Sequence, residues 1–298
     1  MIKIIKIEDI NTLRLDKYLK IKFSALTQSF IEKNIRKKNI LVNNSRTSAK
    51  YIIKENDLVK ILNFHSDLYK NKITFKKNIL IPRKVSELFK KSIIYQDQNF
   101  MILNKWSTIA TQGGSKINIS IDDIIKSISP DYRLVHRLDK DTSGLLIIAK
   151  NLNSAKIFGK LFKSSLIEKT YIALCEGTPK QKESNVLLDI KNKEDKIEHT
   201  KTHYKILDVQ NNISLIQYKP LTGKTHQLRI VSKNLGCSII GDNKYNGYSK
   251  FKNEELKLNA YNLKFIFNDK KFEFFSELSK DFNYFLKKYK FKDLKRYI

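Results

Sequence analysis

The first 63 residues show two helical and two strand-like patterns of apolar positions. Apolar residues recur at helical spacing after Arg14, and again after Thr27, a residue suited to cap a helix. The short runs ILVNN and DLVKIL are typical of strands, with an Asn-Asn turn following the first. The pattern predicts a small α/β unit over residues 1–63.

From residue 92 the pattern changes to the alternation typical of a sheet. The run SIIYQDQNFMILNK reads as two strands around a polar turn, and TYIALCEG, HYKILDV, SLIQYKP and LKFIFN are further strand-like runs. Helical spacing returns at 120–128, 153–164 and 228–235. These runs predict an α+β domain over residues 92–285, with a linker at 64–91. The basic tail at 286–298 is open to two interpretations, a terminal helix that touches RNA or a frayed end.

Charge indicates the kind of partner. The chain of 298 residues has a formal net charge of +28, a field that attracts polyanions: nucleic acid first, an anionic membrane surface second. Residues 1–63 hold 14 Lys and Arg against 6 Asp and Glu. The predicted helix after Thr27 carries a basic face. Its cations are Lys33, Arg36, Lys37 and Lys38.

Several classes of protein are disfavoured. The N-terminus MIKIIKIEDI has no apolar signal-peptide core, and no apolar run approaches membrane-spanning length. Cys175 and Cys237 lie far apart without the spacing of a metal or redox site, which predicts two buried free thiols. His199 and His203 stand in a polar, basic stretch and read as exposed residues. We therefore expect a cytoplasmic protein with no metal and no cofactor.

The run LVHRLDKDTSGLLIIAK at 134–150 is the strongest candidate for chemistry. A crowded polar turn leads directly into an apolar strand, an arrangement that presents reactive side chains at the rim of a sheet. Asp139 and Asp141 are two apart and share a side in an extended segment, as a general acid and base would. Glycosidases usually take such a pair from different strands, so the spacing alone leaves their roles open.

Four blocks of this chain resemble the pseudouridine synthases of the large ribosomal-subunit type. They are ILNKWSTIATQGGS, HRLDKDTSGLLIIAK, EKTYIALCEG and PLTGKTHQLRI with GCSIIGDNKY, in the family's order. The TQGGS form is closest to the C branch of that family. The N-terminal pattern RLDKYL, ILVNN and NDLVKI resembles the small RNA-binding module named after ribosomal protein S-four. Because LTQSFI lacks the further cations usual there, RNA contacts are expected at Lys33, Arg36, Lys37, Lys38 and Arg46.

The resemblance implies a fold and an activity. It implies a catalytic domain with a mixed, largely antiparallel sheet flanked by helices and loops. It also implies isomerisation of uridines in large-subunit ribosomal RNA, by a monomer that needs no cofactor. By resemblance Asp139 is the catalytic carboxylate, Tyr171 stacks on the uracil and Arg229 is the ion-pair partner that keeps Asp139 ionised. Arg137 would hold the vacated position or a phosphate.

Two other readings stay open at this point. The same scaffold could serve a non-catalytic RNA-binding or ribosome-assembly factor, although Asp139, Tyr171 and Arg229 together favour the enzyme. A DNA-binding protein would satisfy the charge but predicts comparable affinity for duplex DNA. For the enzyme and for both alternatives, we expect nucleic-acid binding to depend strongly on salt.

Overall fold

The computed structural model describes residues 1–8, 13–69, 80–114, 117–191, 195–246 and 249–297. The chain divides into two compact units, Met1–Asn78 and Ile79–Ile298. The division falls inside the segment 64–91 that was expected as a linker, of which residues 70–79 lie outside the described part. Helix α3 (Arg83–Lys91), in the same segment, belongs to the second unit, where Phe89 is buried among residues of the core.

The first unit has the two predicted helices and a small antiparallel sheet. Helix α1 covers Leu15–Lys22 and helix α2 Gln28–Arg36, and the Thr27 hydroxyl accepts a hydrogen bond from the Phe30 N–H, as a capping residue does. The strands are β1 (Lys3–Lys6), β2 (Ile40–Val42) and β3 (Leu58–Ile61), in the order β1-β3-β2. Strand β1 was not predicted, because lysines interrupt its short apolar run.

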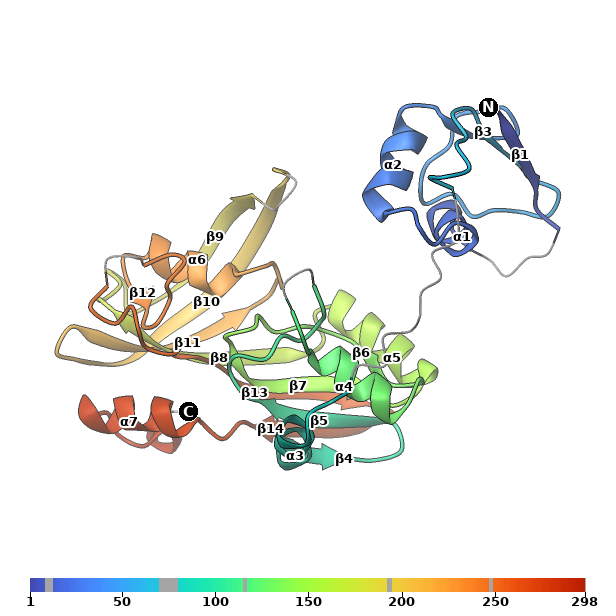
Figure 1. Ribbon diagram of the computed structural model, residues 1–298. Helices are drawn as coiled ribbons and strands as arrows, with labels where there is room; N and C mark the ends of the chain where they lie inside the picture. Colours follow the sequence, from blue (N-terminus) through green and yellow to red (C-terminus); the bar gives the residue numbers. More distant parts are fainter. Residues whose placement is uncertain (9–12, 70–79, 115–116, 192–194, 247–248, 298) are drawn as a thin grey trace. The chain divides into compact units, whose positions relative to one another are not determined.

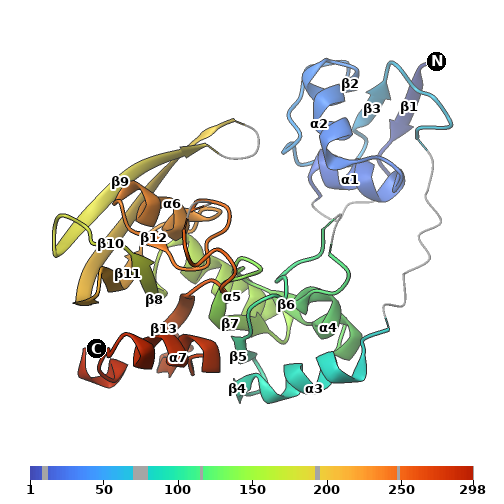
Figure 2. The ribbon, with the colours of Figure 1, turned by 60° about the vertical axis from the view of Figure 1, so that its left-hand side comes forward.

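One large sheet organises the second unit (Figures 1 and 2). Its main path runs β4-β5-β7-β13-β8-β11-β10-β9, with β6 on β7, β12 on β8 and β14 on β13. Among the described strands, β7 and β13 pair in parallel and the other neighbours are antiparallel, so the predicted mixed, largely antiparallel sheet is confirmed. The strands are β4 (Ile93–Gln96), β5 (Phe100–Lys105), β6 (Arg133–Leu134), β7 (Ser143–Ala149), β8 (Glu168–Glu176), β9 (Glu183–Lys191), β10 (Ile197–Gln210), β11 (Ile213–Pro220), β12 (Ser238–Ile239), β13 (Leu258–Phe267) and β14 (Lys270–Phe275).

Alternating side chains give this sheet a core on each face, because successive residues of a strand point to opposite sides. In β7, Leu146 and Ile148 pack with residues of α3 and α4, while Leu145 and Ile147 pack with α5. Around β8 and β11, α6 covers one face and α7 the other. The helices are α4 (Ile121–Ile128), α5 (Leu152–Lys163), α6 (Gln227–Asn234) and α7 (Lys280–Lys288). The three helices predicted at 120–128, 153–164 and 228–235 are therefore confirmed.

The basic tail packs on the sheet. Leu286 at the end of α7, Phe291, and Leu294 in the 3₁₀ turn Leu294–Arg296 are buried in one core cluster with β8 and β11. Of the two interpretations of this tail, the frayed end does not apply to its described residues. None of the helices in the described part of the chain combines the length and the apolar character that a membrane crossing needs.

Candidate active site

The polar turn that was singled out in the sequence lies at the start of β7. Asp139 is on this turn, its side chain 20% exposed, and its carbonyl accepts a hydrogen bond from the Thr142 N–H at 3.2 Å. Gly144 follows within β7 at φ +108°, and a Cβ there would lie 2.4 Å from the Ala260 carbonyl oxygen in β13. Only glycine fits this close crossing, so Gly144 sets where the turn ends and the strand begins.

Two side chains, Lys105 at the end of β5 and Thr111 in the loop that follows, hold the turn in place. The Thr111 hydroxyl donates to the Leu138 carbonyl at 2.7 Å and accepts from the Leu138 N–H at 3.1 Å. The buried ammonium of Lys105 donates to the carbonyls of Trp106, Ile109 and Lys140, each at 3.0 Å. Burial lowers the pKa of Lys105 to about 7, against the opposing charges of Asp141 and Asp139. The turn and the loop after β5 therefore form one hydrogen-bonded unit.

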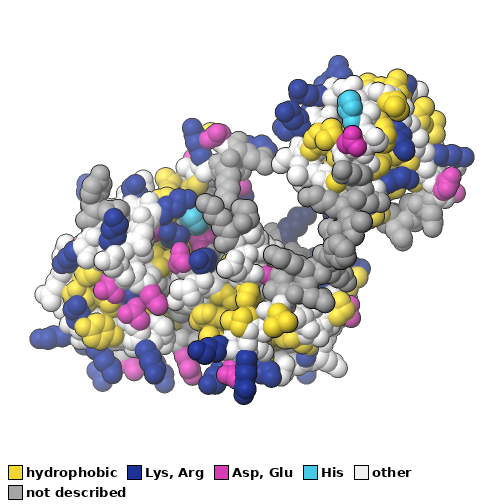
Figure 3. All heavy atoms as spheres, viewed as in Figure 1, with side chains coloured by type: hydrophobic (Ala, Val, Ile, Leu, Met, Phe, Trp, Pro, Cys, Tyr) yellow, Lys and Arg dark blue, Asp and Glu magenta, His cyan; other side chains and the backbone are white. Residues whose placement is uncertain are grey.

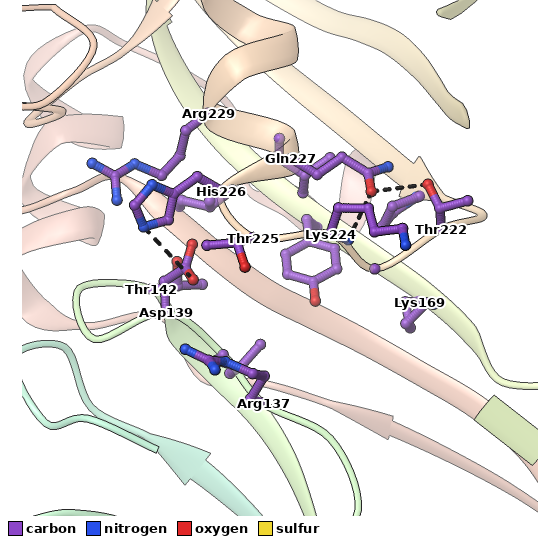
Figure 4. A pocket seen from close by; sticks show the side chains of 16 residues that line it. Arg137, Asp139, Thr142, Lys169, Thr222, Lys224, Thr225, His226, Gln227 and Arg229 are labelled. Carbon is purple, nitrogen blue, oxygen red and sulfur yellow. Dashed lines mark hydrogen bonds and ion pairs between the residues drawn. The ribbon is translucent and has the colours of Figure 1, made fainter. Parts of the chain in front are cut away.

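The opposite wall comes from the loop that leads into α6. Gln227 fixes this loop: its side-chain amide donates to the Thr202 hydroxyl at 2.9 Å and accepts from the Lys224 N–H at 3.0 Å. His226 precedes the helix with φ 56°, in the left-handed region. A histidine in this region is uncommon, and such residues gather at functional sites. The loop thereby directs His226 towards the turn that carries Asp139 (Figure 4).

Two adjoining hollows meet at Asp139. The smaller, of about 110 Å³, includes Tyr171, Lys169 and Thr142 in its lining. The larger, of about 570 Å³, includes Lys140, Asp141 and Lys244. Both are lined by Arg137, Asp139, His226 and Arg229. The structure thus brings together the four residues of this unit that the sequence analysis selected, namely Arg137, Asp139, Tyr171 and Arg229.

His226 is a neighbour of Asp139 that was not among the residues selected from the sequence. Its Nε2 lies 4.0 Å from Oδ1 of Asp139, and its Nδ1 lies 2.9 Å from the Tyr245 hydroxyl. Burial lowers the pKa of His226, and the charge of Asp139 opposes this shift only in part. The sequence did give one signal for His226, its position directly before the Gln-Leu-Arg start of the helix. The direction of its side chain could not be predicted, because it depends on a left-handed backbone.

Arg229 has a different ion-pair partner from the one we expected. Its guanidinium makes two hydrogen bonds to the Asp242 carboxylate, from Nε at 2.8 Å and from Nη2 at 2.6 Å. Burial alone would lower the pKa of Arg229, but these bonds and the charges of Asp242, Asp139 and Asp141 leave that pKa raised. The direct pair is therefore Arg229 with Asp242, and Asp139 interacts with Arg229 through its nearby charge.

Tyr171 lies in β8, where the two halves of the sheet meet. It is paired with Tyr218 of β11 and Ala260 of β13, and it contacts the two core clusters that lie next to each other on one face of the sheet. Burial raises the pKa of Tyr171, and the charge of Asp139 adds to that shift. The phenol is therefore protonated at neutral pH and presents a neutral aromatic ring to the smaller hollow.

The basic residues selected in the first unit are all exposed. Lys33 and Arg36 lie in the last turn of α2, Lys37 and Lys38 follow it, and Arg46 lies in the loop after β2. In Figure 3, Lys and Arg side chains gather at the edge of this unit where Figure 1 draws α2. Four of the five residues thus share one end of the helix.

The histidines regarded as exposed have acidic neighbours. The Nδ1 of His199 lies 2.7 Å from Asp189, and the Nε2 of His203 lies 3.0 Å from Glu183. The side chain of His199 is exposed and that of His203 is partly buried. In the described residues, no three His, Cys, Asp or Glu side chains are grouped so that they could hold a metal ion.

Comparison with known proteins places this chain in a class of RNA-modifying enzymes. Residues 99–234 match the family model for RNA pseudouridylate synthase, and residues 13–59 match the S4 domain. A protein of Rickettsia bellii named ribosomal large subunit pseudouridine synthase C is 39% identical over 261 residues, which cover 80% of this chain and 86% of the relative. A protein of the same name from Vibrio parahaemolyticus is 32% identical over 276 residues, covering 87% of this chain and 86% of the relative. The chain belongs to the pseudouridine synthase family and carries an N-terminal S4 domain.

Solved structures agree on the fold. Human RNA pseudouridylate synthase domain containing 4 aligns with a TM-score of 0.63 at 22% identity, over 74% of this chain and 99% of that one. Human RNA pseudouridylate synthase domain containing 1 aligns with a TM-score of 0.54 at 24% identity, over 63% of this chain and 83% of that one. At these identities the likeness is one of architecture, and it matches the mixed sheet described above.

Proposed function

We propose that this enzyme isomerises specific uridines of large-subunit (23S) ribosomal RNA to pseudouridine, with Asp139 as the catalytic carboxylate. The observation that carries this proposal is the position of Asp139 between two hollows that are lined by three cationic or proton-binding side chains, Arg137, His226 and Arg229. The names of the relatives from Rickettsia bellii and Vibrio parahaemolyticus support the choice of RNA. The net charge of +28 suits a polyanionic substrate.

The reaction requires the bond between C1′ and N1 to break, the base to turn, and C1′ to bond to C5. The proton that leaves C5 is balanced by one gained at N1. One carboxylate can start this sequence, either as a nucleophile at C1′ or as a base at the sugar. Asp139 is a partly exposed carboxylate, which suits either route. The target uridine must first leave its stack to reach Asp139.

Other residues of the site have roles that follow from their positions. Tyr171 offers the uracil a flat neutral surface on which it can stack and turn. Arg137 is exposed at the mouth of both hollows, where it can hold a phosphate or the position that the uridine vacates. Arg229, fixed by Asp242, contributes a positive charge near Asp139.

In the first unit, we infer that Lys33, Arg36, Lys37, Lys38 and Arg46 bind RNA phosphates. Their exposure and their grouping at one end of α2 support this role. We infer a cytoplasmic monomer as well. Both cysteines are buried free thiols, as in proteins of reducing compartments. Size-exclusion chromatography with light scattering would test the oligomeric state.

The substrate is tested by mapping pseudouridines in 23S ribosomal RNA from a strain that lacks this protein. The proposal predicts that one or a few sites lose the modification and regain it when the purified enzyme acts on the unmodified RNA. Unchanged pseudouridine maps in 23S ribosomal RNA, with losses in transfer RNA instead, would reject this substrate and keep the family's chemistry.

A further inference from the structure

A third cavity, separate from the two hollows at Asp139, opens beside the larger of them. It has a volume of about 320 Å³ and lies between α3 and the loop that follows β5. Its lining shares Thr108 and Lys140 with the larger hollow, so the two spaces adjoin. Its walls are otherwise mainly apolar, formed by Val85, Leu88, Trp106, Ile109, Ala110, Ile117 and Ile119. We refer to it as the Trp106 cavity.

The Trp106 cavity leaves apolar surface open next to a charged site. Trp106 is only partly buried, and Leu88 is 49% exposed. The volume lies within the range of sites that bind small flat ligands, and such sites combine apolar walls with a few polar groups. Here the ammonium-bearing Lys140, which is exposed, is the charged residue of the lining.

The cavity is held rigidly with respect to Asp139. Lys105 links the carbonyls of Trp106 and Ile109 to that of Lys140, the residue next to Asp139. Thr108, which the two spaces share, has φ 74°. This region is a true outlier for a β-branched residue, and such strain persists only where the surroundings hold it. The conformation of the loop is therefore fixed before a ligand binds in the cavity.

The shape and the charges select one class of occupant. An apolar slot with an aromatic wall accommodates a flat ring, and a cation at its mouth attracts a negative group attached to that ring. The proposed function places a uridine in the adjoining hollow, which shares Thr108 and Lys140 with the cavity, so the cavity lies beside the place of the same RNA. A nucleobase linked to a phosphate meets both requirements.

We propose that the Trp106 cavity receives a nucleobase that neighbours the target uridine in the RNA, unstacked and laid against Trp106, with its phosphate at Lys140. This inference rests on the proposed function, because it places the neighbouring uridine at Asp139. It gives the enzyme a means to choose among uridines: the favoured site is one whose neighbour can also leave its stack. A base in a firm helix cannot enter, which favours loops and bulges.

The chain offers a direct optical test, because Trp106 is the single tryptophan of its 298 residues. Emission from the wild-type protein is measured with increasing acrylamide, with and without an unmodified transcript of 23S ribosomal RNA. Pseudouridine formation on the same transcript is measured in parallel. The proposal predicts that bound RNA shields Trp106, so that the acrylamide quenching constant falls several-fold.

Variants separate stacking from simple packing. Trp106→Leu keeps an apolar side chain but removes the aromatic face, and it is expected to raise KM for the transcript roughly tenfold with kcat little changed. Trp106→Phe should restore most of that loss. Leu88→Glu places a negative charge at the exposed rim and should also raise KM. Leu152→Glu is the matched control, since Leu152 is 59% exposed and does not line the cavity.

The outcomes distinguish this inference from the proposed function. If the transcript is modified while acrylamide reaches Trp106 equally with and without RNA, the cavity is not a nucleobase site and the proposed function stands. If RNA shields Trp106 but no pseudouridine forms in any ribosomal RNA, the proposed function fails, and the assignment of the cavity to a neighbour of the target uridine fails with it. Should Trp106→Leu not fold, the quenching of the wild type and the comparison of Leu88→Glu with Leu152→Glu still decide the question. Equal KM values for those two variants would overturn the inference.

Discussion

Arg229 and Asp242 form a buried, bidentate ion pair at the edge of the candidate active site. The side chains are 7% and 1% exposed, and Nη2 of Arg229 lies 2.6 Å from Oδ1 of Asp242. Asp242 also accepts hydrogen bonds from the N–H groups of Lys244 and Tyr245, each at 3.1 Å. The pair therefore fixes both the guanidinium and the loop after β12.

Removal of one partner is expected to be costly. Asp242→Asn leaves Arg229 buried without its counter-ion, and the free energy of unfolding should fall by about 3–5 kcal/mol, measured by urea denaturation. The matched control is Glu87→Gln, which breaks the exposed pair with Arg83 and should cost less than about 0.5 kcal/mol. Equal losses of unfolding free energy in the two variants would show that the buried pair stabilises the protein no more than the exposed pair does.

Gly144 offers a test of the crossing between β7 and β13. A Cβ at this position would lie 2.4–2.8 Å from backbone atoms of Ala260, at φ +108°. Gly144→Ala should therefore prevent stable folding or shift the turn that carries Asp139, with loss of activity. Gly159→Ala is the control: the site lies in helix α5 with open space around it, so alanine should stabilise the protein by up to about 1 kcal/mol. Thermal unfolding of both variants checks the contrast, and a stable, active Gly144→Ala protein would contradict it.

His136 should make stability depend on pH. Its Nε2 accepts a hydrogen bond from the Ile147 N–H at 2.8 Å, and its ring stacks on Phe162. Burial and the charge of Lys169 lower the pKa of His136 to about 3, from 6.5. Between these values the unfolded chain binds a proton that the folded chain does not, so the free energy of unfolding falls as pH drops.

The slope of the free energy of unfolding against pH isolates the contribution of His136. One proton taken up on unfolding corresponds to at most about 1.4 kcal/mol per pH unit. The free energy of unfolding, measured by urea denaturation, should therefore fall more steeply below pH 6.5 for the wild type than for His136→Gln. The glutamine variant has no proton to gain at this position. Identical slopes in the two proteins would mean that His136 is accessible to protons in the folded state.

The basic end of α2 should contribute to the salt dependence of RNA binding. Replacing Arg36, Lys37 and Lys38 by Gln should weaken binding of 23S transcript and lower the slope of log K against log salt by up to about 1 per lost phosphate contact. A triple variant at exposed lysines of β13 and β14 (Lys264, Lys270 and Lys271) removes the same charge elsewhere. Filter binding at several salt concentrations compares them; equal slopes would count against a specific role for α2.

Much of the candidate active site could be located from the sequence because its residues stand in compact motifs. Arg137 and Asp139 share one turn, and Tyr171 and Arg229 lie in two further blocks, so locating the motifs located the residues. Asp242 was missed as the partner of Arg229. It is on another loop, and no local pattern tells which of several carboxylates will face a given arginine.

The structural supports were harder to predict for the same reason. Lys105 reads as one of 50 lysines, and only the fold shows that its ammonium joins three carbonyls beneath the turn of Asp139. The direction of His226 depends on a left-handed backbone that residue type alone does not require. Strand β1 is absent from the sequence prediction because its pairing with β3 overrides a weak local pattern.

Asp139 and Asp141 provide the most direct test of the central claim, because they lie two residues apart on the same turn. Asp139→Asn and Asp141→Asn remove the same charge while keeping side-chain size. Single-turnover formation of pseudouridine on unmodified 23S transcript should be abolished by Asp139→Asn and retained within about tenfold by Asp141→Asn. RNA binding by both variants, measured in parallel, should match the wild type within a few-fold. Full activity of Asp139→Asn, or loss of activity only in Asp141→Asn, would contradict the assignment of Asp139 as the catalytic carboxylate.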